Sequence, residues 1–147
     1  MAGNTSPQFC RNGNIGACAL TAPNGASDGS GTIGVDIFLA FAADPLNGSL
    51  VEYVRFVPTA TAAASTTAAI GRVFASSATA GVVNVANTHL LGEVVLRAEA
   101  LLGASPITWI ELPVNLRLPA GWTILVTTDV APAASTAWKA VTVGGDY

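Results

Sequence analysis

Short segments rich in β-branched and aromatic residues recur along this chain, and turn-forming residues separate them. One such segment, residues 122–128 (WTILVTT), directly follows the turn sequence PAG at 119–121. β-Branched and aromatic residues favour strands, whereas Pro and Gly favour the turns between them. The segment 122–128 therefore predicts a strand, and comparable segments dominate the chain after residue 31.

Seven or eight short strands are expected between residue 32 and the C-terminus. Apolar and polar residues alternate in several of them, as they do in strands with one buried face. In residues 32–42 the alternation places one set of apolar side chains on a single face: Ile33, Val35, Ile37, Leu39 and Phe41. The expected strands cover residues 32–42, 50–57, 70–76, 82–85, 90–98, 107–118, 122–128 and 136–143.

Two prolines bear on the limits of these strands. Pro58 is expected to end the strand at 50–57. Pro113 lies inside the strand expected at 107–118, and because proline cannot donate to a hydrogen-bond ladder, this strand is predicted to lie at a sheet edge or to contain a bulge. Residues 59–69 show no periodicity, and their Thr and Ser residues disfavour a helix.

The series of strands predicts the fold class. No long amphipathic helix is indicated, and a regular series of short strands and turns is typical of a β-sandwich or a barrel. Eight strands in two sheets would form a jelly roll. We therefore expect an all-β fold, a jelly-roll-like β-sandwich, and a length of 147 residues suits one such domain.

The first 31 residues differ in composition from the rest. They are dense in Gly, Asn, Ser and Pro, which is typical of a loop or an extended arm. Residues 15–20 are apolar enough either to form one strand or to dock on a neighbouring molecule. We expect an extended N-terminal arm at 1–31 and a sandwich domain at 32–147, so a protein without residues 1–31 is predicted to stay folded.

Charged residues are scarce. They make up 10% of the chain, against about 25% in typical soluble proteins, and the mean hydropathy is +0.54. One interpretation is an ordinary domain with a surface of Ser, Thr and Ala. The interpretation favoured here is that much of the surface lies against other subunits, because charged residues are depleted at interface cores.

The scattered basic residues and the lack of a long apolar run disfavour two classes of partner. They are scattered singly rather than clustered, at Arg11, Arg55, Arg72, Arg97, Arg117 and Lys139. A groove that follows nucleic-acid phosphates needs clustered Lys and Arg, so no nucleic acid is expected as a partner. No run of about 20 strongly apolar residues indicates a transmembrane helix, so no membrane partner is expected either.

The acidic residues form no recognisable catalytic motif. Four of the nine fall within expected strands, at Asp36, Glu52, Glu93 and Glu111, where two carboxylates facing one cleft would be needed for glycoside hydrolysis. The favoured interpretation is that they face solvent or pair with strand arginines, namely Arg55, Arg72 and Arg97. We therefore expect no enzyme activity and no catalytic residues.

Nucleophile, metal and cofactor sites are also disfavoured by the sequence. His89 is the only histidine, no Gly-x-Ser-x-Gly motif accompanies it, and a surface position is expected for it. Cys10 and Cys18 would be compatible with a disulfide across a short loop or with two free thiols, whereas four zinc ligands cannot be assembled. No cofactor and no metal are expected.

Three tryptophans are the remaining candidates for binding residues: Trp109, Trp122 and Trp138. They could form a platform on which sugars stack, or they could anchor the core or a subunit interface. The second interpretation is favoured, because aromatic residues are enriched in cores and at interface hot spots.

The second half of the chain resembles the capsid decoration, or cement, proteins of tailed bacteriophages. The segments that carry the resemblance are GEVVLRA (92–98), IELPVNLRLPAGWTILVTT (110–128) and the ending AWKAVTVGGDY (137–147). The resemblance covers roughly residues 32–147 and implies a β-sandwich or jelly-roll subunit. It further implies a homotrimer on the outside of the icosahedral head, with the major capsid protein as its partner. The resemblance implies no catalytic residue in this chain.

The resulting hypothesis is a structural virion protein that binds the capsid surface and links neighbouring capsid subunits, after assembly in the host cytoplasm. The alternative is a tail- or fibre-associated virion protein that binds a host glycan.

Overall fold

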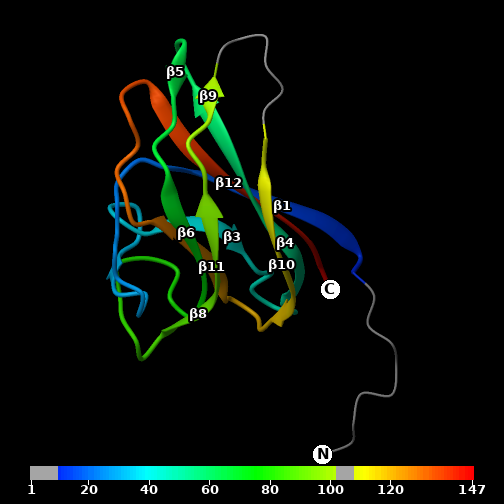
Figure 1. The fold of residues 1–147 in the computed structure, drawn as a ribbon. Helices are drawn as coiled ribbons and strands as arrows, with labels where there is room; N and C mark the ends of the chain where they lie inside the picture. Colours follow the sequence, from blue (N-terminus) through cyan, green and yellow to red (C-terminus); the bar gives the residue numbers. More distant parts are fainter. Residues whose placement is uncertain (1–9, 102–107) are drawn as a thin grey trace, which may run out of the picture.

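All regular structure in the described part of the chain is β-strand, arranged in two packed sheets of four strands (Figure 1). The computed structural model describes residues 10–101 and 108–147. The first sheet has the order β1 (Asn12–Leu20), β12 (Thr136–Asp146), β4 (Ser49–Ala60) and β10 (Ile110–Leu118). The second sheet has the order β3 (Phe38–Ala42), β11 (Thr123–Thr128), β6 (Ala69–Ser76) and β8 (Thr88–Leu96). The prediction of an all-β sandwich is confirmed.

Two short strand pairs accompany these sheets. The first joins β2 (Gly31–Thr32) to β7 (Val82–Val83), and the second joins β5 (Ala64–Ser65) to β9 (Ala100–Leu101). The pair β2–β7 matters for packing because Val83 contacts a small apolar cluster on the second sheet.

The eight long strands pair in a nested order. β6 pairs with β8, β4 with β10, β3 with β11 and β1 with β12, all antiparallel. This is the pairing of one long hairpin whose successive strand pairs lie alternately in the two sheets. As a result, the first and last strands of the described chain lie side by side.

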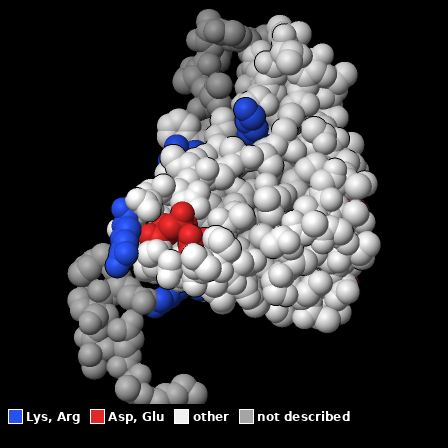
Figure 2. Space-filling model, turned by 180° about the vertical axis from the view of Figure 1, so that it is seen from behind, with Lys and Arg blue, Asp and Glu red and all other residues white. Residues whose placement is uncertain are grey.

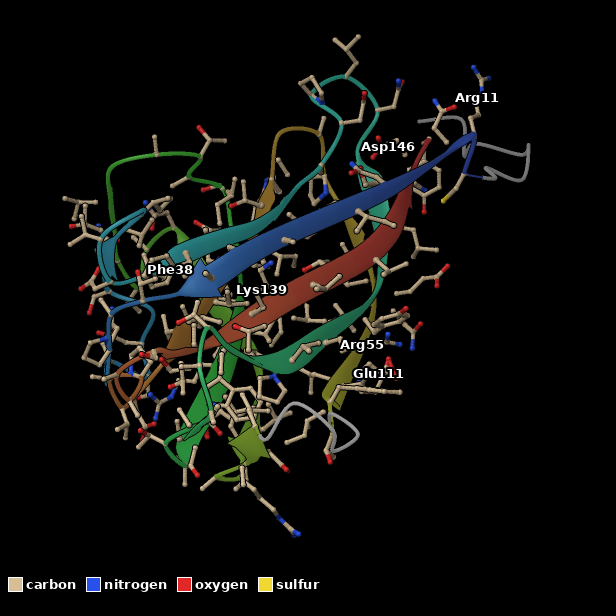
Figure 3. The ribbon with its side chains drawn as sticks, turned by 90° about the horizontal axis from the view of Figure 1, so that it is seen from above. Arg11, Phe38, Arg55, Glu111, Lys139 and Asp146 are labelled. Atoms are coloured by element: carbon tan, nitrogen blue, oxygen red, sulfur yellow. The ribbon has the colours of Figure 1, made fainter. Side chains whose placement is uncertain are left out.

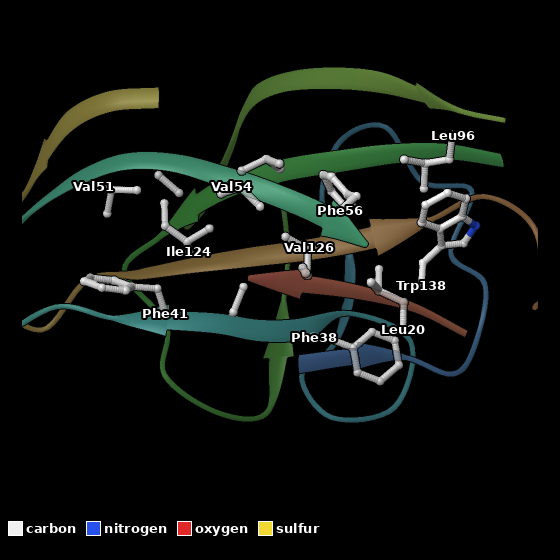
Figure 4. Close-up of a cluster of buried hydrophobic side chains, with 14 of the residues drawn as sticks. Leu20, Phe38, Phe41, Val51, Val54, Phe56, Leu96, Ile124, Val126 and Trp138 are labelled. Atoms are coloured by element: carbon white, nitrogen blue, oxygen red, sulfur yellow. The ribbon is translucent and has the colours of Figure 1, made fainter. Parts of the chain in front are cut away.

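The main core fills the space between the two sheets (Figure 4). Side chains from both inner faces are buried there, among them Leu20, Val54, Phe56, Ile124 and Trp138. Burying one large apolar side chain contributes about 1.5–3 kcal/mol, so this layer is the main source of stability.

Strand β11, which accounts for most of residues 122–128, is buried on both of its faces. It is an inner strand of the second sheet, and all six of its residues are buried. Ile124 and Val126 face the main core, whereas Leu125 faces outward into a second cluster with Ile37 and Phe74. The chain's own connections therefore cover the outer side of this sheet.

The single alternating strand predicted at residues 32–42 is wrong. Thr32 ends the short strand β2, and the next strand begins only at Phe38; there Leu39 faces outward while Phe38, Ala40 and Phe41 are buried. The preceding residues turn, because Gly34 has a φ of +85° and Asp36 Oδ1 accepts a hydrogen bond from the Thr32 amide at 2.6 Å. An aspartate that caps a turn is locally indistinguishable from a polar residue in an alternating strand.

The two prolines behave differently. Pro113 lies on the edge strand β10, where the register shifts between Pro113 and Leu116, so the prediction of an edge or a bulge is confirmed. Pro58 does not end its strand, because β4 continues to Ala60 beside β12. The strand β10 reaches only as far as Phe56, so β4 has an open edge at Pro58 that tolerates a residue without an N–H.

The prediction of an arm at 1–31 followed by a sandwich at 32–147 is wrong for residues 12–20. These residues form β1, which pairs with β12 over nine residues and places Leu20 in the main core. The sandwich therefore includes residues well before 32, and a protein without residues 1–31 would lose one complete strand. Of the two alternatives for residues 15–20, the strand is confirmed, and it begins earlier than expected because residues 12–14 (Asn-Gly-Asn) have low strand propensity. Residues 1–9 of the expected arm lie outside the described residues.

Close packing of β1 on β3 predicts a specific sensitivity at Gly16. A Cβ atom at Gly16 would overlap the carbonyl oxygen of Ala40, whereas one at Gly13 on the same strand would meet nothing. We expect Gly16→Ala to lower the free energy of unfolding by about 3 kcal/mol and Gly13→Ala to change it much less. Denaturant unfolding of both variants measures this difference, and equal stabilities would show that β1 does not pack on β3 as described.

Candidate interaction surfaces

Two acidic residues of the long strands, Glu93 and Glu111, are partnered with arginines. Arg55 contacts Glu111 at 3.0 Å between β4 and β10, and the two side chains lie together in Figure 3. Arg72 contacts Glu93 at 2.6 Å between β6 and β8. The expected pairing of strand acids with strand arginines is confirmed for these two pairs. Within the described residues, no three His, Cys, Asp or Glu side chains gather closely enough to hold a metal ion.

The acids in turns have a structural role. Asp44 accepts hydrogen bonds from the backbone amides of Asn47 and Leu46, and these bonds lower the pKa of its carboxyl group. Asp146 accepts hydrogen bonds from Ser49 and Asn14, which join β12 to β4 and to β1 at one end of the first sheet. These carboxylates fix turns and strand ends.

Both cysteines are free thiols. Residues 12–20 are extended, so the Cα atoms of Cys10 and Cys18 lie roughly 20–25 Å apart, whereas a disulfide requires less than about 7 Å. Burial raises the pKa of the Cys18 thiol to about 12, although a hydrogen bond with the Ala140 backbone acts in the opposite direction. Of the two possibilities left open by the sequence, the structure selects free thiols.

The three tryptophans do not form one platform. Trp138 is buried in the main core, and its indole nitrogen donates a hydrogen bond to the carbonyl oxygen of Thr67 at 3.3 Å. Trp122 is half-buried and stacks with the exposed His89 at 6.1 Å between ring centroids. Trp109 is 53% exposed and lies beside Arg55. A core position is confirmed for Trp138, and a surface position is confirmed for His89.

One candidate surface follows from an uncharged stretch of sequence. Residues 73–92 contain no Asp, Glu, Lys or Arg, and four large apolar side chains in this stretch are exposed: Val82, Val85, Leu90 and Leu91. We call these four residues the apolar patch. Figure 2 shows wide areas of one face of the molecule that carry neither acidic nor basic residues. The strand pattern of this stretch predicts only strands and loops, whereas its lack of charge is the signal in the sequence for an interaction surface.

The turn that carries Val82 and Val85 has a defined geometry. Val83 is anchored in the small cluster on the second sheet, so its neighbour Val82 points outward and is 71% exposed. The Asn84 amide donates to Asn87 Oδ1 at 2.9 Å, and the Asn87 amide donates to the carbonyl oxygen of Asn84 at 3.0 Å. Val85, 68% exposed, is held between these two asparagines. Val82 and Val85 are therefore presented by a braced turn, whereas Leu90 and Leu91 lie on β8.

The outer face of the first sheet is the second candidate surface. One row of side chains crosses all four strands in register: Ile15, Val143, Tyr53 and Pro113. Beside Tyr53 and Pro113 lies an open hollow of about 490 Å³, lined by Leu50, Glu52, Tyr53, Glu111, Pro113 and Asn115. The hollow depends on irregular strand registers, which sequence reasoning indicated only through Pro113.

Comparisons with protein-family models, with curated proteins and with solved structures give no match to this chain. No helix in the described residues has the length and apolar character needed to cross a membrane.

The two thiols are predicted to differ sharply in reactivity. In the folded protein at pH 8, we expect a disulfide-exchange reagent to label exposed Cys10 and to label Cys18 only after unfolding, because only the thiolate reacts. Since the pKa of Cys18 is raised from 9.0 on folding, stability should also fall as the pH rises from about 9 towards 12. Rapid labelling of both thiols before unfolding would contradict the burial of Cys18.

Proposed function

We propose that this protein is a structural virion component that binds the outside of an icosahedral phage head and links neighbouring capsid subunits. Its partners in this proposal are the major capsid protein and further copies of itself, as a homotrimer. The observation that carries the proposal is the apolar patch of Val82, Val85, Leu90 and Leu91 within twenty uncharged residues. Exposed apolar groups on a braced turn suit a permanent protein contact.

The physical chemistry of interfaces supports this use of the patch. The fully buried centre of an interface is apolar and poor in charged residues, whereas the rim is polar. Val82 and Val85 are surrounded in sequence by Ser, Thr, Asn, Ala and Gly, which supply such a rim without placing a charge in the contact. A Val side chain that leaves water contributes about 1.5 kcal/mol or more, which helps to offset the cost of association when several copies bind together.

The fold and the sequence resemblance support the proposal from a different side. The nested pairing of eight strands in two sheets supports the jelly-roll interpretation, and viral capsid proteins commonly use jelly rolls. A fold hosts many functions, so this support is one of analogy. The resemblance of residues 32–147 to phage decoration proteins supplies the specific partner.

Many weak contacts between this protein and the capsid would stabilise the capsid without any catalytic reaction. A protein that binds only the assembled lattice shifts the equilibrium towards that lattice by mass action. In a trimer, the first contact raises the effective concentration for the second and third contacts, so attachment is much stronger than one patch would allow.

The proposal is tested by co-sedimentation of the purified protein with empty, undecorated heads of its parent phage, with its mass in solution measured alongside. We expect saturable binding by a trimer. A monomer that stays in the supernatant with intact heads would contradict the proposal.

A variant pair locates the contact. The double substitution Val82→Asp and Val85→Asp places charge in the apolar patch, and we expect it to weaken head binding by at least about tenfold, which corresponds to 1.4 kcal/mol. Ile15→Asp is the matched control, because Ile15 is similarly exposed at 70% but lies on the first sheet. Equal losses in both proteins, or no loss in either, would show that the patch is not the contact.

A further inference from the structure

We propose that the hollow on the outer face of the first sheet is a binding site for a neutral saccharide. This inference goes beyond the capsid contact, because the hollow lies on the first sheet whereas Val82 and Val85 lie over the second sheet. The two surfaces belong to opposite sides of the sandwich, so both can be occupied in one molecule.

Two facing irregularities in the strands create the hollow. On β4, Glu52 has no paired residue on either neighbouring strand. Tyr53 and Val51, on either side of it, pair with two consecutive residues of β12 and with two residues of β10 that are three positions apart. On β10, Val114 and Asn115 are likewise skipped between Pro113 and Leu116. Bulges redirect side chains and are frequent beside functional sites, and here two of them coincide.

The backbone at Asn115 is a second unusual feature at the same place. Its φ of +46° lies in the left-handed region that non-glycine residues seldom occupy. Such a conformation costs of order 1 kcal/mol and persists only where the surrounding structure fixes it. Asn115 stays on the exposed face of β10 with Glu111 and Pro113, and it lines the hollow with them.

The lining combines apolar surfaces with groups that form hydrogen bonds. Leu50, the Tyr53 ring and Pro113 supply the apolar part, while Glu52, Glu111 and Asn115 supply two carboxylates and an amide. The hollow has a volume of about 490 Å³ and is open to solvent, so a sugar would bind with one face against the lining.

Arg55 fixes two of these side chains. Its guanidinium lies 5.2 Å from the centroid of the Tyr53 ring and also 5.2 Å from that of Trp109. Its Nε and Nη2 atoms both donate to Oε2 of Glu111, at 3.3 and 3.0 Å. This arrangement positions the Glu111 carboxylate and the Tyr53 ring before any ligand arrives.

The chemistry of the lining selects the ligand class. Ionised carboxylates only accept hydrogen bonds, so the ligand must carry donors such as hydroxyl groups. Arg55 neutralises much of the charge on Glu111, so the second carboxylate, Glu52, leaves the hollow with a net negative charge that disfavours an anionic ligand. A purely apolar ligand would leave the carboxylates and the amide without partners as they lose water. A pyranose ring meets these demands, since its C–H face packs on Tyr53 and Pro113 while its hydroxyls reach the polar groups.

The test uses the full-length protein labelled with ¹⁵N and titrated with glucose, galactose, mannose and N-acetylglucosamine. Sugar is added to about 50 mM, well above a dissociation constant of about 1 mM expected for a small open site. We expect saturable shifts of the backbone amides of Tyr53 and Asn115 with at least one of these sugars. Absence of saturable shifts with all four sugars would overturn the proposal, as would shifts confined to residues outside the hollow.

Three variants test the residues that line the hollow. Tyr53→Ala should weaken binding about tenfold or more through loss of the stacking surface, and Tyr53→Phe should retain it. Asn115→Gly removes the amide but suits the positive φ, so it should weaken binding in a folded protein. Tyr147→Ala is the matched control, because this half-buried tyrosine stacks on Arg117 outside the hollow and its loss should leave binding unchanged.

The outcomes separate this proposal from the capsid contact. Sugar binding that survives both Tyr53→Ala and Asn115→Gly would overturn the site, whatever the head-binding assay shows. Loss of head binding in Val82→Asp and Val85→Asp with sugar binding intact is the result expected if both proposals hold.

Discussion

The pairing of β12 with two partners is the interaction on which the rest of the structure depends. β12 pairs with β1 along one edge and with β4 along the other, so it joins the N-terminal strand to the centre of the first sheet. At one end, Asp146 fixes the register through hydrogen bonds from Ser49 and Asn14. Given that register, Val51 and Val54 can both face the core only if one residue between them is skipped, and the skipped residue is Glu52. The hollow thus follows from the strand register that buries both Val51 and Val54 in the core.

The sequence was informative wherever a strand carries its own signal. The apolar segment at 122–128 predicted a strand, and Pro113 within 107–118 predicted an edge or a bulge, because side-chain chemistry alone determines both. The sequence was less informative where a neighbouring strand determines the structure. Residues 12–20 form a strand because β12 offers a complete ladder and Ala40 leaves room only for a glycine at position 16. Likewise, the hollow depends on register, which becomes defined only when three strands meet.

The two sheets treat their outer faces differently. The second sheet is covered by the chain's own connections, which bury Ile37 and Val83 against Phe74 and leave the next valines exposed on a turn. The first sheet is left uncovered by the described residues along the row that ends at Tyr53 and Pro113. One sandwich therefore presents an apolar turn on one side and a polar-lined hollow on the other, and this separation would let a single small domain hold a lattice and face solvent at once.

The nested order of strand pairing has a consequence for synthesis on the ribosome. Because the innermost pair, β6–β8, is closest in sequence, it can form while the chain is still short, whereas β1 must wait for β12, more than a hundred residues later. Contacts between such distant segments make folding slow, since the entropy of closing a long loop is lost before the contacts form. During that interval the apolar inner face of the half-built sandwich is exposed, which favours association between nascent copies. The scarcity of charge that suits the finished surface thus makes the unfinished chain prone to aggregate.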